Sequence, residues 1–167
     1  MDQLDEICTA NAAYRLPRWE DLPDLELYMD QVLSLAERYL GGCPGLDGRA
    51  LTASMVNNYV KLGVIPAPVK KRYSRVHLAR LLMLCLLKGV LPIASIRALF
   101  EAGLAGTSEQ DYYNAFCRAC AQAGQEAAAA ARADAEGTPA LILRAALRAQ
   151  AEQALAQALL GLQDGRA

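Results

Sequence analysis

The stretch LTASMVNNYVKLGVIPAPVKKRYSRVHLARL, Leu51 to Leu81, carries the signals on which the prediction of the fold rests. Thr52 is placed to cap a helix, because its hydroxyl can accept a hydrogen bond from a free amide of the first turn. That helix would end near Leu62, with Gly63 as its terminator. The prolines of VIPAPVKKRY exclude a helix there and leave room for a short extended hairpin, or wing. Ser74 then caps a second helix, so the stretch predicts helix, wing and helix.

The first of these helices has separate apolar and polar faces. The residues at core spacing are Met55, Val56, Tyr59 and Leu62. The polar residues at positions i, i+3, i+4 and i+7 are Ser54, Asn57, Asn58 and Lys61. This spacing places them in one stripe along the helix. Asparagine amides can pair with adenine edges, at about 1–3 kcal/mol of discrimination per good pair. The stripe is therefore a candidate DNA-reading surface, and an ordinary solvated face is the alternative.

Positive charge is concentrated in the middle of the chain, although the formal net charge is only −1. From Gly48 to Phe100 there is no Asp or Glu, and there are nine basic residues: Arg49, Lys61, Lys70, Lys71, Arg72, Arg75, Arg80, Lys88 and Arg97. Such asymmetry indicates contact with a polyanion. The candidate phosphate contacts, from the wing and the next helix start, are Lys70, Lys71, Arg72 and Arg75. The alternative is a chance cluster that only keeps the surface soluble.

The composition predicts an all-α protein of one ordinary domain size. Hydrophobic residues make up 54% of the 167 residues but aromatic residues only 6%, which favours helices over sheets. Besides the helix from Thr52, we expect helices over 24–40, 75–89, 92–103 and 107–136, and a last one from Thr138. The middle one, 75–89, is apolar on nearly every side and should be central. The predicted organisation is an irregular arm, 1–23, anchored by Trp19, a module, 24–104, and an alanine-rich antiparallel helical hairpin, 105–167.

Catalytic and metal chemistry find little support in the sequence. His77 is the single histidine, and the basic segment has no carboxylate pair, so we expect no enzyme, cofactor or metal. Cys117 and Cys120 form a lone C-x-x-C that packing explains best, with a thiol or metal sensor as the alternative. The five scattered cysteines do not form a disulfide pattern. The acidic N-terminus is no signal peptide and no apolar run is long enough to span a membrane, so we expect a cytoplasmic protein.

The order of these elements resembles the DNA-binding module of the MerR family. The segments that carry the resemblance are NNYVKLGVIPAP, KKRYSRVHLARLLMLCLLK and IASIRALF. The chain is more closely similar to a bacterial family of MerR-like proteins catalogued only as a domain of unknown function. The resemblance implies a winged helix-turn-helix with a small β-wing, binding to double-stranded DNA, and a homodimer formed through a helix after the module.

Three functions remain open at the level of the sequence. The first is a transcriptional regulator that reads DNA in two half-sites as a dimer. The second is a protein-interaction module on a retained winged helix-turn-helix. It is favoured by Asn57 and Asn58, which stand where MerR proteins usually carry an arginine and an aromatic residue. The third is a regulator that senses a small molecule in a pocket walled by Tyr112 and Tyr113.

Overall fold

The computed structural model describes residues 3–46, 51–134 and 137–164. Over these ranges it contains seven α-helices, one short 3-10 helix and no β-strand, which confirms the all-α prediction. The elements are α1 (Gln3–Ala13), η1 (Trp19–Asp21), α2 (Met29–Leu40), α3 (Ala53–Lys61), α4 (Arg75–Leu87), α5 (Ile93–Leu104), α6 (Glu109–Arg132) and α7 (Thr138–Asp164). No helix within the described ranges is both long and apolar enough to cross a membrane.

The chain forms two compact units, Tyr14–Gln122 and Met1–Ala13 with Ala123–Ala167. The predicted domain boundaries, at 23/24 and 104/105, both lie inside the first unit. Helix α6 belongs to both, since it begins in one unit and ends in the other.

Helix α4 is the centre of the Tyr14–Gln122 unit, as its apolar sequence predicts. Its buried residues are His77, Leu78, Ala79, Leu81, Leu82, Met83, Leu84 and Cys85. Helix α2 packs on α4 and also on α3. The other α-helices of the unit also bury side chains, for example Val56 of α3, Phe100 of α5 and Tyr113 of α6, and so do the segments between them. The basic segment is thus held on a closely packed core.

Local hydrogen bonds explain where the helices begin. The Thr52 hydroxyl accepts the Met55 amide at 3.2 Å, as predicted. Helix α2 starts at Met29 rather than at residue 24, because Leu27 is extended and exchanges two backbone hydrogen bonds with Tyr73, at 2.8 and 2.9 Å. The predicted cap of α6 at Thr107 is wrong by one residue.

The cap of α6 is formed by Ser108 and Asp111. The Ser108 hydroxyl accepts the Asp111 amide at 3.0 Å and donates to the Asp111 carboxylate at 2.8 Å. A serine followed three residues later by an acid is also a helix-start signature, like the Thr107–Gln110 pair that was predicted. The cap was therefore predicted one residue too early. The helix ends at Arg132, and the expected end at Glu136 lies outside the described residues.

The Met1–Ala13 and Ala123–Ala167 unit departs most from the prediction. The arm expected to be irregular contains helix α1, which packs on the last turns of α6. Arg132 donates to the Asp5 carboxylate at 2.8 Å and to the Thr9 hydroxyl at 2.9 Å. At Gly124 an added Cβ would lie 2.4 Å from the carbonyl oxygen of Asn11, so only glycine allows this approach.

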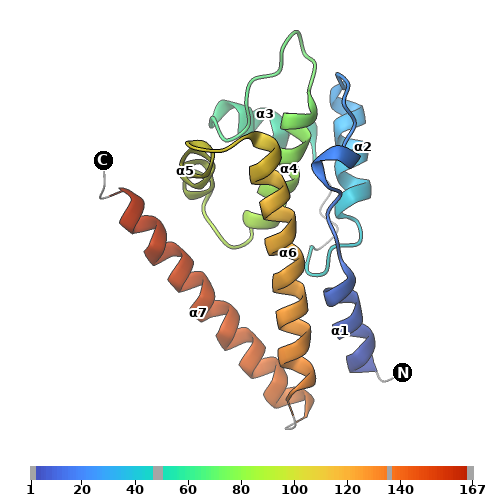
Figure 1. The fold of residues 1–167 in the computed structure, drawn as a ribbon, viewed down its shortest axis with the longest axis vertical. Helices are drawn as coiled ribbons and strands as arrows, with labels where there is room; N and C mark the ends of the chain where they lie inside the picture. Colours follow the sequence, from blue (N-terminus) through green and yellow to red (C-terminus); the bar gives the residue numbers. More distant parts are fainter. Residues whose placement is uncertain (1–2, 47–50, 135–136, 165–167) are drawn as a thin grey trace. The chain divides into compact units, whose positions relative to one another are not determined.

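The antiparallel C-terminal hairpin stays a prediction, because most of α6 belongs to the other unit. Figure 1 shows α7 leading away from the end of α6. Six large apolar side chains of α7 are more than half exposed: Ile142, Leu143, Leu147, Leu155, Leu159 and Leu162.

Candidate nucleic-acid interface

Helix α3 presents the predicted polar stripe to solvent. Ser54, Asn57, Asn58 and Lys61 are all exposed. On the opposite face Val56 and Tyr59 are buried, as expected, whereas Leu62 is 45% exposed. The helix therefore packs on the core through one face. The side-chain amides of Asn57 and Asn58 and the ammonium group of Lys61 are exposed on the other face.

The segment that follows α3 contains a two-residue turn with two lysines at its tip. Val69 and Arg72 exchange backbone hydrogen bonds in both directions, at 2.9 and 3.2 Å. Lys70 and Lys71 lie between them with positive φ angles of 49° and 60°. These values define the type I′ turn that joins hairpin strands. We call Val69–Arg72 the lysine hairpin. Figure 1 shows this loop, between α3 and α4, rising beyond the ends of the helices.

The arginines beside the lysine hairpin pack against aromatic rings. The Arg72 guanidinium lies 3.7 Å from the centre of the Tyr28 ring. Arg75 lies 5.5 Å from the Trp19 ring and 3.8 Å from the Asp24 carboxylate, and its side chain is only 19% exposed. Such contacts stabilise a cation and hold it in place. Lys70 and Lys71 are exposed, whereas Arg72 and Arg75 are half-buried.

Carboxylates from outside the basic segment neutralise three of its nine cations. Arg75 meets Asp24, Arg80 meets Glu109 and Arg97 meets Glu101. Arg49 lies outside the described residues. Within the part of the chain that the structure describes, the other five have no ion pair: Lys61, Lys70, Lys71, Arg72 and Lys88. Uncompensated positive charge is thus found at the end of α3, on the lysine hairpin and at the end of α4.

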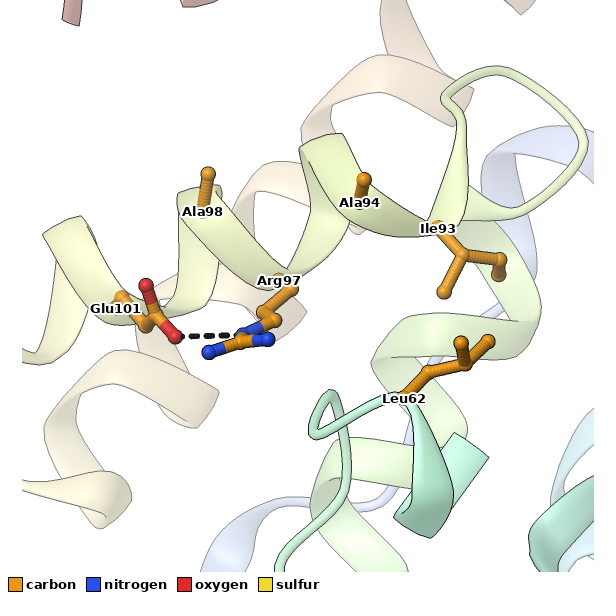
Figure 2. Close-up of a pocket in the computed structure, with 6 residues that line it drawn as sticks. All are labelled: Leu62, Ile93, Ala94, Arg97, Ala98 and Glu101. Carbon is orange, nitrogen blue, oxygen red and sulfur yellow. Dashed lines mark hydrogen bonds and ion pairs between the residues drawn. The ribbon is translucent and has the colours of Figure 1, made fainter. Parts of the chain in front are cut away.

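A shallow groove of about 490 Å³ lies between the end of α3 and one face of α5. Figure 2 shows Leu62 facing Ile93 across it, with Arg97 and Glu101 joined by an ion pair at the other end. Arg97 also lies against Gly63, where an added Cβ would be 3.4 Å from the guanidinium carbon. Gly63 has a φ of 72°, so it ends α3 in the left-handed conformation, as predicted.

The tyrosines expected as a pocket wall are instead packed into the Tyr14–Gln122 unit. Tyr113 is completely buried and donates its hydroxyl to the Pro17 carbonyl at 2.9 Å. Tyr112 lies against Gly103 and packs edge-to-face on Phe100 at 6.2 Å. Trp19 packs on Tyr113 at 6.2 Å, so the indole does anchor the segment before α2.

Burial favours the neutral form of three cysteine thiols, those of Cys43, Cys117 and Cys120. Burial raises the pKa of Cys117 to about 11, and it also raises the pKa of Cys43 and of Cys120. Tyr14 lies beside Cys43, a neighbourhood that the sequence spacing did not indicate. No group of three or more His, Cys, Asp or Glu side chains in the described residues is arranged to hold a metal ion. The packing interpretation of Cys117 and Cys120 is consistent with this geometry.

Comparison with known proteins places the chain in a family. No curated protein matches the chain, and no solved structure does. The family described as Domain of unknown function (DUF1836) matches residues 17–116, which include α2 to α5, the polar stripe and the lysine hairpin. Since this match covers more than half of the chain, the protein belongs to the DUF1836 family.

Proposed function

We propose that this protein is a cytoplasmic, non-catalytic transcriptional regulator that binds double-stranded DNA through a MerR-like winged helix-turn-helix. In this proposal α3 is the reading helix and the lysine hairpin is the wing. The observation that carries it is the position of Lys70 and Lys71. Left-handed backbone at a non-glycine residue costs on the order of 1 kcal/mol. Two adjacent lysines in that conformation, exposed and without an ion pair among the described residues, fit a phosphate-binding tip.

The roles of the two surfaces follow from their chemistry. The amides of Asn57 and Asn58 are donors and acceptors that suit base edges in the major groove. The ammonium groups of Lys61, Lys70 and Lys71 suit phosphates, which fix position without reading sequence. Arg72 and Arg75 would add positive charge beside the lysine hairpin. The rings of Tyr28 and Trp19 and the carboxylate of Asp24 hold these two side chains in place.

Selection from a random duplex pool tests the proposal. Purified protein should enrich a motif with two related halves at near-physiological salt. Asn57→Ala with Asn58→Ala should blunt the motif at one or two positions, by about 1–3 kcal/mol of discrimination each. Both residues are exposed, so the free energy of unfolding of the variant should stay within about 0.5 kcal/mol of that of the wild type. Absence of any retained DNA at low salt would refute the proposal.

The uncovered face of α7 supports a homodimer as part of the proposal. The helix has 27 residues and is about 40 Å long. At 100° per residue, Leu143, Leu147, Leu155 and Leu162 fall within about one third of its circumference. Without Ile142, which faces the other way, five large side chains exposing roughly 100 Å² each would bury about 1,000 Å² between two copies, the lower limit of a specific interface. A second copy of α7 is therefore the expected occupant.

Sedimentation of charged variants tests the dimer. Leu147→Glu with Leu155→Glu should shift the protein to a monomer at micromolar concentration, because two buried carboxylates would oppose association. Ile142→Glu is the matched control, since Ile142 is similarly exposed at 64% but faces away from that stripe. It should leave the dimer intact. A monomeric wild type would show that α7 is covered in some other way.

The groove beside α3 favours a second candidate, a protein-interaction module. Leu62, Ile93 and Ala94 offer an apolar floor, and Arg97 with Glu101 offers a polar edge, which together suit a short peptide segment. In that case Leu62→Asp would abolish partner binding, whereas substitutions at Lys70 and Lys71 would not.

A further inference from the structure

His77 contacts the chain on both sides of the lysine hairpin. Its Nδ1 accepts the backbone amide of Ser74 at 2.9 Å. Its Nε2 donates to the carbonyl oxygen of Ala67 at 3.3 Å. Ala67 precedes the hairpin and Ser74 follows it, so one side chain of α4 joins the chain on either side of Val69–Arg72. Only one neutral tautomer satisfies both bonds, with the proton on Nε2 and none on Nδ1.

The surroundings of His77 favour that neutral ring. The residue is buried, with 6% exposure, and the Tyr73 ring packs edge-to-face on it at 5.4 Å. Burial lowers the pKa of His77, while the carbonyls of Ala67 and Pro66 act in the opposite direction. The charged groups that face it are Arg80, which lowers its pKa, and Glu109, which raises it. These two charges are paired with each other, with 3.2 Å between Arg80 Nε and a Glu109 carboxylate oxygen.

We propose that His77 is the positioning residue of the lysine hairpin, which its neutral imidazole holds closed and which its protonation releases. In the imidazolium both nitrogens carry hydrogen, so Nδ1 could no longer accept from the Ser74 amide. The Ser74 hydroxyl, 2.9 Å from Nδ1, would be the one acceptor of Ser74 left within reach of the new N–H. The bond to Ala67 would survive, but the backbone amide of Ser74, which holds the chain just after the hairpin, would lose its acceptor. The proposal rests on the proposed function only for its effect on DNA binding.

The sign of the pH dependence follows from the lowered pKa. Once the hairpin is released, His77 returns to the usual pKa of 6.5, so the released state binds protons more readily than the closed state. The closed hairpin is therefore fully favoured above pH 6.5. It loses this stabilisation as the pH falls below 6.5 and through the lower pKa of the closed state.

Protonation of His77 is expected to weaken DNA binding, although it adds a positive charge. An added positive charge should tighten binding to a polyanion as the pH falls. Release of the hairpin should instead weaken it, because Lys70 and Lys71 would no longer be held at one tip. If about one third of molecules remain closed at pH 5.5, the apparent Kd for a random 20-base-pair duplex rises about threefold.

The test combines NMR of the full chain with DNA titration from pH 5.5 to 7.5. His77 is the only histidine, so its ring signals are unambiguous. In the wild type, the amide shifts of Val69 and Arg72 should follow the same midpoint as the ring. His77→Gln is the conservative variant, because glutamine at the third helical position can accept the Ser74 amide without titrating. It should keep the wild-type hairpin shifts and affinity of pH 7.5 at every pH.

The outcomes separate this inference from the proposed function. Hairpin amides that do not titrate with the ring, or a His77→Gln protein that weakens at low pH as the wild type does, would overturn the positioning role. Coupled titration in a protein that retains no DNA at any pH would sustain the positioning role and refute DNA binding. His77→Ala should disorder the hairpin at all pH values, and a folded His77→Ala protein with unchanged Val69 and Arg72 shifts would also overturn it.

Discussion

Lys70→Ala with Lys71→Ala should weaken binding to every DNA duplex by about 30-fold at 0.1 M salt, from about 1 kcal/mol per lost phosphate contact. The plot of log affinity against log salt should lose about 1.8 units of slope, because each neutralised phosphate contributes about 0.9. The relative ranking of sequences should not change, since phosphate contacts carry no direct sequence information. Fluorescence anisotropy with specific and random duplexes at several salt concentrations measures all three quantities.

A second variant separates the charge of the lysines from the shape of the turn. Lys70→Asn with Lys71→Gly places Asn-Gly, the preferred type I′ sequence, at the two positive-φ positions. It removes the same two charges while making the hairpin more stable. Equal losses of affinity in the two double variants would attribute binding to charge. Recovery in the Asn-Gly protein would mean that hairpin geometry is what matters, which would contradict phosphate binding by these ammonium groups.

Arg118→Ala provides the matched control for loss of charge. Arg118 is an exposed arginine of α6 in the same Tyr14–Gln122 unit and outside the basic segment. Its removal should change the salt slope by much less than one unit, since it is not placed at the proposed interface. If Arg118→Ala lowered the DNA affinity and the salt slope as much as the loss of one hairpin lysine, binding would depend on net charge rather than on the lysine hairpin.

The sequence indicated the basic cluster but not which of its side chains are exposed and which pack against other parts of the protein. Lys70 to Arg75 read as one group of candidate contacts, because proximity in sequence was the only guide. Two of the four pack against groups that lie about 50 residues earlier in the sequence. Arg72 packs on Tyr28, and Arg75 lies beside Trp19 and Asp24. Long-range contacts of this kind depend on the packing of the whole unit, and no local pattern encodes them.

Local signals were reliable where the physical cause was itself local. Thr52 caps α3 and Gly63 ends it, because a hydroxyl three residues from an amide and a left-handed glycine need no tertiary partner. Helix α1 was missed because its residues have little apolar periodicity, so that no helical face can be recognised in the sequence. It is held by packing against α6 through Arg132 and Gly124. The start of α2 was misplaced because Leu27 is held extended by Tyr73.

The largest loss of stability should come from the centre of α4. Leu82→Ala should lower the free energy of unfolding by about 2–5 kcal/mol, because Leu82 is completely buried and the removed atoms leave a cavity in a packed core. That is a large part of the about 5–15 kcal/mol that holds a typical domain folded. Urea unfolding followed by the fluorescence of Trp19 is the measurement. Trp19 is the single tryptophan and packs on Tyr113, so its signal reports the Tyr14–Gln122 unit.

Leu25→Ala is the matched control for this cavity. It removes the same atoms from a side chain of the same unit that is 58% exposed, so it should cost less than about 1 kcal/mol. Equal losses from the two variants would contradict the central position of α4. The core variant also bears on the interface, since α4 carries His77 at its first turn and the lysine hairpin leads directly into it. While Leu82→Ala remains folded, its DNA affinity should equal that of the wild type, because the proposed contacts are made by the surface that this core supports.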